Sequence, residues 1–498
     1  MIGQTLVAIM GLVERSFFLS NLSSDYLGLN SLFSSILSFL SLTELGLGTA
    51  FAYSLYGPLA DGDDIMVRSL MRYFSRAYRV VGFVIFGLGL CLLPFLGVIL
   101  KTDIPLSSTR IYYVIYLTGI SGGYLFSANE ILIEADQKLY INTIVASFVQ
   151  LILYVVQICI LAYTRNFTYY LIAFACATIG KYFFIYITSF RLFSFLRKKE
   201  EVRHLDKQFV KGLYRNLRAL MLNKIGGVIS SGSDSILISM LVSTAALGIY
   251  SNYMLIIIGV GSGTAILFTS VKAPIGNLCA IESPKKSYIW FRRINAYYSF
   301  LIGLVYTVLA VCINPLLNVL YPQAEVYSAV TAVLLSLTRY FDVMRYIVTN
   351  YEDAYGLFRQ DRYKTLVSAV LNISCSVFFV KVFNLGVAGI CLGTICSQVF
   401  VYSWLEPMMV HRYGFMNSSK GYWLQYIKSV LITLISIGLG LWVCSLIPIC
   451  GRFAVVLDIL VVLTIYIVVA FILMPKQMRL ILRLIQKQYK RAGGGMQI

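Results

Sequence analysis

Three charged residues lie close together within a long apolar stretch, at Arg339, Asp342 and Arg345. Their spacing of three residues places them along one side of a helix. If that helix crosses a membrane, each charge costs about 2.5–3.5 kcal/mol near the bilayer centre, so such residues usually pair or line a hydrated passage. Arginine can bind phosphate through two parallel N–H groups. The stripe therefore predicts either a structural ion pair or part of a binding site for an anionic head group.

Other charged residues fall within predicted membrane spans and extend the set of candidates. Glu14 and Arg15 are adjacent and point about 100° apart on a helix, so we expect at least one of them to reach another helix or a cavity. The basic candidates for an anion-binding cavity are Arg15, Lys181, Lys224, Arg339 and Arg345. The acidic residues at similar depth are Glu14, Glu44, Glu130, Asp234 and Asp342. The structural alternatives are an ion pair for Asp342 with Arg339, a hydrogen bond in a helix contact for Glu44, close packing for Asp234 and partial exposure to water for Glu130.

The elements that carry these residues are predicted to be membrane-spanning helices. Hydrophobic residues make up 59% of the 498 residues and charged residues only 13%, whereas soluble chains carry roughly 25% charged residues. Apolar runs of about 20 residues, the length that crosses a bilayer as a helix, recur along the chain. We therefore predict an all-α polytopic membrane protein of about 14 transmembrane helices. They are expected near 2–20, 27–56, 79–100, 109–133, 139–163, 167–195, 213–241, 246–271, 294–317, 326–351, 364–382, 386–405, 424–446 and 453–474.

The net charge of +19 is explained by topology rather than by nucleic-acid binding. Lysine and arginine concentrate in cytoplasmic loops of membrane proteins. With the N-terminus inside, most of the 41 lysines and arginines fall in inner segments. The predicted outer ends hold only Lys101, Arg110, Arg165, Lys381 and Arg452. Both termini are therefore predicted to be cytoplasmic, and no nucleic-acid partner is expected.

An internal repeat divides the chain into two similar halves. It is carried by three pairs of segments in the same order: DYLGLNSLF at 25–33 with AALGIYSNY at 245–253, CLLPFL at 91–96 with CINPLL at 312–317, and ADQKLYI at 135–141 with QDRYKTLV at 360–367. Six predicted helices per half give both halves the same topology, as in transporters with parallel repeats. We therefore expect two pseudosymmetric lobes around a central cavity, with two extra helices outside.

The repeat sets the predicted domain boundaries. Residues 1–200 form the first lobe, 201–406 the second lobe, 407–475 the two extra helices and 476–498 a basic cytoplasmic tail. Projected through the repeat, Met221 corresponds to about Met1. We therefore expect the first helix to be short or to lack its beginning.

The loops disfavour an enzyme. The predicted outer loops are about 3–8 residues long and supply no catalytic acid, base or nucleophile set, which counts against a membrane glycan polymerase. The sequence has no GxxxxGK[ST] motif, so ATP is not expected to be the direct energy source. A cation-coupled drug antiporter remains an alternative, but its cavity is expected to be acidic rather than arginine-containing.

Residues 25–60, DYLGLNSLFSSILSFLSLTELGLGTAFAYSLYGPLA, resemble the second helix of bacterial polysaccharide-biosynthesis flippases. These are the Wzx-type oligosaccharide flippases of the multidrug/oligosaccharidyl-lipid/polysaccharide (MOP) exporter superfamily. Further similar elements are ADQK at 135–138, KIGGVI at 224–229, LGIYSNY at 247–253 and DRYK at 361–364. The resemblance covers essentially the whole chain and implies a MATE-like fold of two six-helix lobes.

The resemblance also implies a function. Such proteins move undecaprenyl-diphosphate-linked oligosaccharide from the inner to the outer leaflet of the bacterial inner membrane, for O-antigen, capsule or exopolysaccharide export. Their partners would be the lipid-linked substrate, membrane lipid, and the polymerase and chain-length proteins of the pathway. Cationic cavity residues would hold the diphosphate, and no cofactor is implied beyond Na+ or H+ as a coupling ion. Candidates for ion coupling or gating are Glu44, Glu130, Asp234 and Asp342.

Overall fold

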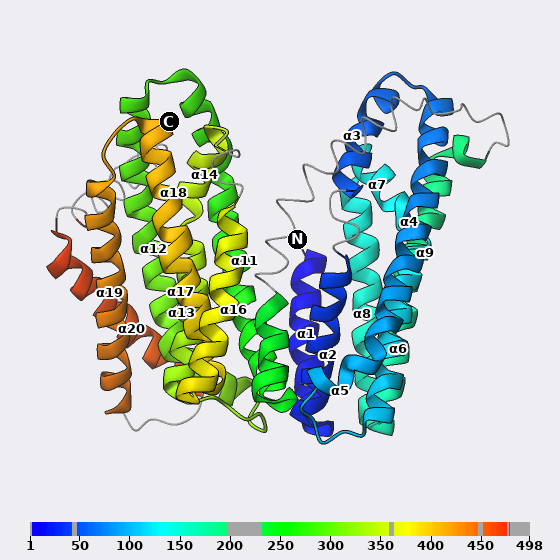
Figure 1. Ribbon diagram of the computed structural model, residues 1–498, viewed down its shortest axis with the longest axis horizontal. Helices are drawn as coiled ribbons and strands as arrows, with labels where there is room; N and C mark the ends of the chain where they lie inside the picture. The colour runs from blue at the N-terminus through cyan, green and yellow to red at the C-terminus, as the bar shows by residue number, and fades with distance from the viewer. Residues whose placement is uncertain are drawn as a thin grey trace, which may run out of the picture. The chain divides into compact units, whose positions relative to one another are not determined.

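The computed structural model describes residues 2–41, 47–197, 232–357, 363–446, 452–475 and 478, and these residues form helices and their connections without strands (Figure 1). Nine helices within these residues are long and apolar enough to cross a membrane. The prediction of an all-α polytopic membrane protein is therefore confirmed. The chain separates into two compact units, Met1–Ile249 and Tyr250–Ile498. The domain boundaries predicted from the repeat stay predictions.

The first unit contains the helices up to the start of α11. They are α1 (Ile2–Asn21), α2 (Ser24–Leu40), α3 (Leu47–Ala60), α4 (Asp64–Leu92), α5 (Leu96–Ile99), α6 (Leu106–Gly123), α7 (Ala128–Ala135), α8 (Leu139–Thr164) and α9 (Phe167–Leu192). A short helical turn, η2 (Leu93–Phe95), lies between α4 and α5. Two more, η3 (Ser194–Arg197) and η4 (Ile238–Val242), come after α9. The segment predicted as one helix at 109–133 is divided into α6 and α7 by turns at 124–127.

Helix α4 begins much earlier than the sequence pattern indicated. The predicted span started at residue 79, but the helix starts at Asp64 and includes four arginines before its apolar part. Asp63 caps the helix by accepting a hydrogen bond from the Met66 backbone N–H at 2.9 Å. Such a cap satisfies a donor that would otherwise lack a partner at the helix start. The basic end of α4 is therefore regular helix, which fixes the directions of its side chains.

The core of the first unit packs α4 against α3, α7 and α9. Phe51 of α3 stacks on Phe74 of α4 with ring centroids 3.8 Å apart. Leu70 of α4, Leu132 of α7 and Ile185 of α9 are fully buried in the same cluster. Burial of an aliphatic or aromatic side chain of this size contributes roughly 1.5–3 kcal/mol. This core holds the arginine-bearing face of α4 in a defined orientation.

The second unit contains the remaining part of α11 (Thr244–Ile281) and all later elements. They are α12 (Pro284–Leu320), α13 (Ala329–Met344), α14 (Tyr346–Ala354), α16 (Lys364–Phe383), α17 (Gly386–Ser397), α18 (Ser403–Met409), α19 (Lys420–Ser445) and α20 (Arg452–Leu473). The π-helical turn η5 (Gln398–Tyr402) joins α17 to α18, and a second one, η6 (Val410–Phe415), extends α18, so that one continuous helical run ends at Phe415. The predicted helix end at 405 therefore falls inside this run.

Helices α12, α19 and α20 pack together in the second unit. The hydroxyl of Tyr466 on α20 donates to the backbone carbonyl of Phe300 on α12 at 3.1 Å. This approach requires a glycine at position 303, because a β-carbon there would overlap the Tyr466 hydroxyl. Tyr466 is almost completely buried. Helix α20, one of the two helices predicted to lie outside the repeat, is thus held to α12 by a buried polar contact.

The repeat motif occupies equivalent environments in α2 and α11. Leu27 and Leu247 are both buried. A β-carbon on Gly28 would overlap the backbone oxygen of Thr244, and one on Gly248 would overlap that of Ser24. The two glycines thus make reciprocal close contacts between the starts of the two helices. Glycine is needed at both positions because the backbones approach too closely for any side chain.

Candidate functional site

The predicted stripe of Arg339, Asp342 and Arg345 is held as a set of ion pairs. Arg339 Nη1 donates a short hydrogen bond to Asp342 Oδ2. On the other side, Arg345 Nε lies 3.7 Å from Asp342 Oδ1. Helix α13 ends at Met344, so Arg345 occupies the junction between α13 and α14. Arg339 and Asp342 therefore form the ion pair that the structural alternative predicted, and Arg345 leaves the stripe with one positive charge in excess.

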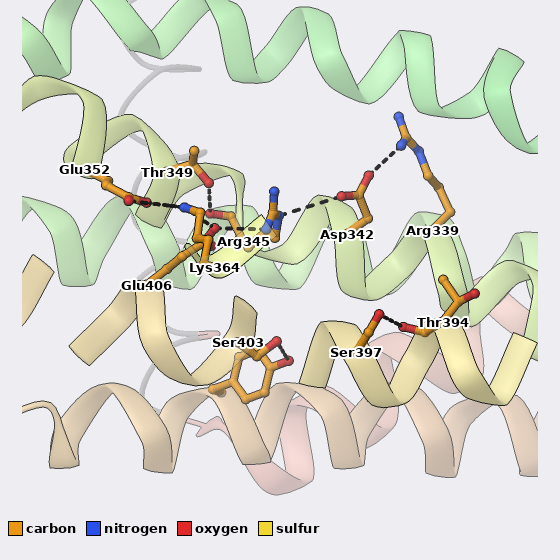
Figure 2. A network of polar contacts seen from close by, with 11 residues as sticks. Arg339, Asp342, Arg345, Thr349, Glu352, Lys364, Thr394, Ser397, Ser403 and Glu406 are labelled. Atoms are coloured by element: carbon orange, nitrogen blue, oxygen red, sulfur yellow. Dashed lines mark hydrogen bonds and ion pairs between the residues drawn. The ribbon is translucent and has the colours of Figure 1, made fainter. Parts of the chain in front are cut away.

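Further charged residues from other helices extend the stripe into a network (Figure 2). Arg345 Nη1 lies 2.9 Å from Glu406 Oε1, and Lys364 Nζ lies 2.8 Å from the same oxygen. Lys364 also contacts Glu352 Oε2 at 2.9 Å. We call Arg339, Asp342, Arg345, Glu406, Lys364 and Glu352 the ion-pair network. It joins α13, α14, α16 and α18 within the second unit.

Burial increases along the ion-pair network from Arg339 toward Glu406. The side chain of Arg339 is 32% exposed, that of Arg345 20%, and that of Glu406 0%. A charge at such depth is tolerated only when opposite charges and hydrogen bonds replace water. The six side chains comprise three acids and three bases, so their formal charges cancel. The face of the Tyr402 ring, 3.9 Å from Arg345 Cζ, adds a cation–π contact at the centre.

This arrangement limits what the ion-pair network can bind. The buried part has its donors engaged by carboxylates, so an anion there would have to displace one of them. At the more exposed end, Arg339 Nη1 is engaged by Asp342, and Arg339 Nε, like Arg345 Nε, is a buried atom without a hydrogen-bond partner among the described residues. Gly261 of α11 packs directly against this guanidinium group, since a β-carbon there would lie only 3.1 Å from Arg339 Nε. With its side chain 32% exposed, Arg339 is the most accessible base of the network.

Three members of the ion-pair network were not identified from sequence. Glu406 precedes Pro407 and falls just beyond the predicted helix end at 405, and Lys364 lies at the start of its predicted helix. Glu352 follows the predicted end of its helix by one residue. Because the partners come from three helices, no spacing rule connects them. The surplus of one arginine over the single aspartate in the stripe was the available signal that another acid should lie nearby.

In the first unit, Glu14 and Arg15 take different environments. Glu14 is buried and accepts a hydrogen bond from the Tyr170 hydroxyl of α9 at 3.0 Å. Arg15, at the next position of α1, is half-buried. The expectation that one of the pair reaches another helix is therefore confirmed, and the acid is the one that does so.

The remaining predicted residues are spread over several elements. Lys181 of α9 is half-buried and lies 3.8 Å from the centroid of the Tyr182 ring. Glu130 of α7 is half-buried, and its backbone carbonyl accepts from Asn142 Nδ2 at 2.9 Å. Asp234 is half-buried in the apolar helix Gly232–Val242. Lys224 and Glu44 lie outside the described residues. A single cavity that unites these positions stays a prediction.

Comparisons by sequence and by structure give different results. No protein-family model matches the chain, and a search of the curated proteins found no match. Solved structures do match. The lipid II flippase MurJ in an inward closed conformation is similar with a TM-score of 0.66 at 15% identity, over 96% of this chain and 99% of that chain.

Two MATE transporters are also similar in structure. An inward-facing multidrug resistance MATE family transporter of the MOP superfamily gives a TM-score of 0.64 at 13% identity, over 82% of this chain and 95% of that chain. The MATE multidrug transporter DinF-BH gives a TM-score of 0.57 at 15% identity, over 84% of this chain and 94% of that chain. This protein therefore has the fold of MOP-superfamily transporters and is a multi-pass membrane protein.

Proposed function

We propose that this protein is a flippase that moves an undecaprenyl-diphosphate-linked oligosaccharide from the cytoplasmic to the outer leaflet by alternating access. The observation that carries the proposal is the extent of the structural match. A protein described as a lipid II flippase matches 96% of this chain, whereas the MATE transporter of similar TM-score matches 82%. The structural match to a flippase thus extends over more of this chain than the match to a multidrug transporter does, which favours a lipid-linked substrate.

A second observation supports a substrate with a long hydrocarbon chain. The second unit contains a cavity of about 290 Å³ between α11, α12 and α20. Its lining is apolar, with residues such as Ile256, Val308, Ile313, Val455 and Leu463. Apolar walls of this kind bind hydrocarbon without requiring any polar group to lose its hydration. We propose that an isoprenoid chain occupies this cavity while the head group moves.

In this proposal the head group is bound by basic residues. Arg15, Lys181, Lys224, Arg339 and Arg345 are the proposed contacts for the diphosphate and for acidic sugars. Arg339 is the best placed member of the ion-pair network, because its side chain is the most exposed of the three bases in it. Asp342 would compete with the diphosphate for Arg339, so head-group binding would be linked to rearrangement of the network.

Coupling to an ion gradient forms a further part of the proposal. Glu44, Glu130, Asp234 and Asp342 are the proposed coupling or gating acids, with Na+ or H+ as the ion. We place the protein in the bacterial inner membrane with both termini cytoplasmic. Its pathway would be O-antigen, capsule or exopolysaccharide export, with the polymerase and chain-length proteins as partners.

The competing proposal is a cation-coupled drug antiporter. It is supported by the TM-score of 0.64 with a MATE family transporter, which is close to that with the flippase. An antiporter for cationic aromatic compounds would need an excess of acidic groups. The ion-pair network instead has equal numbers of acids and bases, which favours the flippase.

Deletion of the gene tests the proposal directly. We expect undecaprenyl-diphosphate-linked oligosaccharide to accumulate in the cytoplasmic leaflet, with loss of surface polymer. Leaflet-resolved labelling of lipid-linked sugars would measure this. Complementation with wild type should restore export, Arg339→Gln should not, and Lys285→Gln, a matched change of an exposed lysine, should. Normal surface polymer combined with raised sensitivity to cationic dyes would contradict the flippase proposal and support the antiporter.

A further inference from the structure

The first unit contains a polar cavity that the transport proposal does not use. Its volume is about 530 Å³, within the range of about 300–1,000 Å³ that is typical of small-molecule sites. Arg68, Arg72 and Arg79 of α4 line it together with Asn129 of α7 and Tyr186 of α9. We call this the arginine cavity. Among the described residues that line it, none is acidic.

The three arginines form one stripe on α4. At about 100° per residue, Arg72 lies about 40° and Arg79 about 20° around the helix axis from Arg68. Ser75, which also lines the cavity, falls on the same side. Arg76 is rotated by about 80° from Arg68 and does not line it. The spacing of these residues therefore aims three guanidinium groups into one space.

The walls of the arginine cavity are held in place by buried contacts. Asn129 is buried, and its side-chain amide donates to Ser189 Oγ of α9. Arg79 Nε donates to the backbone carbonyl of Ser75 at 3.1 Å, which leaves its terminal N–H groups for other partners. Arg68 is buried, whereas Arg72 and Arg79 are exposed. The cavity thus combines a buried, hydrogen-bonded Asn129 with two solvent-exposed arginines, Arg72 and Arg79.

The position of the arginine cavity along α4 matches the depth of lipid head groups. The apolar part of the helix starts directly after Arg79, since Val80 to Leu100 contains no charged residue. The helix Asp64–Leu92 is 29 residues long, roughly 43 Å, and exceeds the hydrocarbon thickness of about 30 Å. Its arginine end therefore lies at or beyond the membrane surface, on the side predicted to be cytoplasmic.

We propose that the arginine cavity is a binding site for a phosphate or diphosphate group at the membrane surface. A guanidinium group binds two phosphate oxygens at once through parallel N–H groups, and the described residues of the lining bring no carboxylate to Arg72 and Arg79. Basic pockets between membrane helices on the cytoplasmic side bind anionic head groups for the same reason. The rings of Phe126 and Tyr186 provide an apolar wall for whatever carries the phosphate. The ligand is either a lipid head group or a free phosphate compound.

Calorimetric titration of the purified full-length protein in detergent can test this site. The probes are geranyl diphosphate, inorganic pyrophosphate and, as an uncharged control, geraniol. The test variant is Arg72→Gln/Arg79→Gln, because both side chains are exposed and their loss should not prevent folding. We expect its affinity for geranyl diphosphate to fall about tenfold for each arginine removed, since hydrogen bonds to charged groups have at least that effect.

Matched variants make the result specific to the cavity. Arg76→Gln removes one exposed arginine from the same helix outside the cavity, as each half of the test variant does inside it, and should retain wild-type affinity. Arg72→Lys/Arg79→Lys keeps the charge but not the paired N–H groups, so it should lose less than the glutamine variant. Arg339 lies in the second unit, outside the arginine cavity. The variant Arg339→Gln should therefore still bind geranyl diphosphate at the cavity, whereas Arg72→Gln/Arg79→Gln should lose this binding. Size-exclusion chromatography and circular dichroism establish that each variant is folded.

The outcomes separate the two sources of phosphate and can overturn the proposal. Geranyl diphosphate binding at least tenfold tighter than pyrophosphate would assign a lipid head group, and equal affinities would assign a free phosphate compound. The proposal is wrong if neither anion binds, if geraniol binds equally well, or if Arg76→Gln and Arg72→Gln/Arg79→Gln have equal effects. The measurement requires no translocation, so its result is independent of the flippase proposal.

Discussion

The ion-pair network of the second unit and the arginine cavity of the first use the same residue type in opposite ways. In the network, Arg345 is engaged by Glu406 and Asp342 and contributes to the packing of four helices. In the cavity, Arg72 and Arg79 are exposed on a wall without acidic residues among the described lining. The comparison shows that the role of an arginine in a membrane protein depends on which carboxylates other helices bring to it.

The largest loss in the free energy of unfolding is expected from Glu406→Gln. This change leaves Arg345 and Lys364 without their shared buried carboxylate, and breaking a buried pair costs about 3–5 kcal/mol. The loss should be seen as a lower unfolding temperature of the detergent-solubilised protein. As a control, Glu282→Gln breaks only the exposed pair with Lys286 and should cost about 0.3–0.5 kcal/mol. Equal effects of both changes would show that the network does not stabilise the second unit.

A smaller loss is expected from adding a methyl group at the repeated glycines. Gly28→Ala and Gly248→Ala each force a β-carbon against a backbone oxygen, and overpacking costs about 1–3 kcal/mol. Similar shifts in unfolding temperature for both would support equivalent roles of the two copies of the motif. Gly57→Ala is the control, because its new β-carbon meets no atom within 4 Å. A shift for only one of the two repeat glycines would show that the halves differ there despite the similar sequence.

Arg339→Gln should change stability little but abolish export. Its ion pair with Asp342 is about one-third exposed, so its contribution is on the order of 1 kcal/mol or less, and Arg345 remains as a partner for Asp342. Export in the complementation assay should nevertheless be lost, because this residue is the most exposed base of the network and the proposed contact for the diphosphate. If the Arg339→Gln variant retained export but lost stability, Arg339 would have a structural role and no role in binding the head group.

The smallest effect is a difference in salt sensitivity between the two regions. Salt screens exposed charges much more than buried ones. Raising the ionic strength should therefore weaken anion binding at the arginine cavity severalfold. The contribution of the ion-pair network to the unfolding temperature should change little. Titration and thermal unfolding in the same salt series would measure both. An unfolding temperature that falls in parallel with anion affinity would mean that the network is hydrated like the cavity.

The sequence alone was sufficient for the features that depend on local pattern. Apolar runs of about 20 residues predict spanning helices because only a helix satisfies its backbone in hydrocarbon. The spacing of Arg339, Asp342 and Arg345 correctly placed them on one face, and the adjacency of Glu14 and Arg15 correctly predicted that one of them contacts another helix. These inferences hold because the geometry of one helix is set by its own residues.

Only the tertiary structure decided which charges meet. Glu352, Lys364 and Glu406 join the stripe from α14, α16 and α18, and no spacing along the chain connects them. The same is true of the arginine cavity, whose lining combines Arg72 and Arg79 of α4 with Asn129 of α7 and Tyr186 of α9. The physical reason is that pairing in low-dielectric surroundings depends on distances between helices, and packing of the whole unit sets those distances.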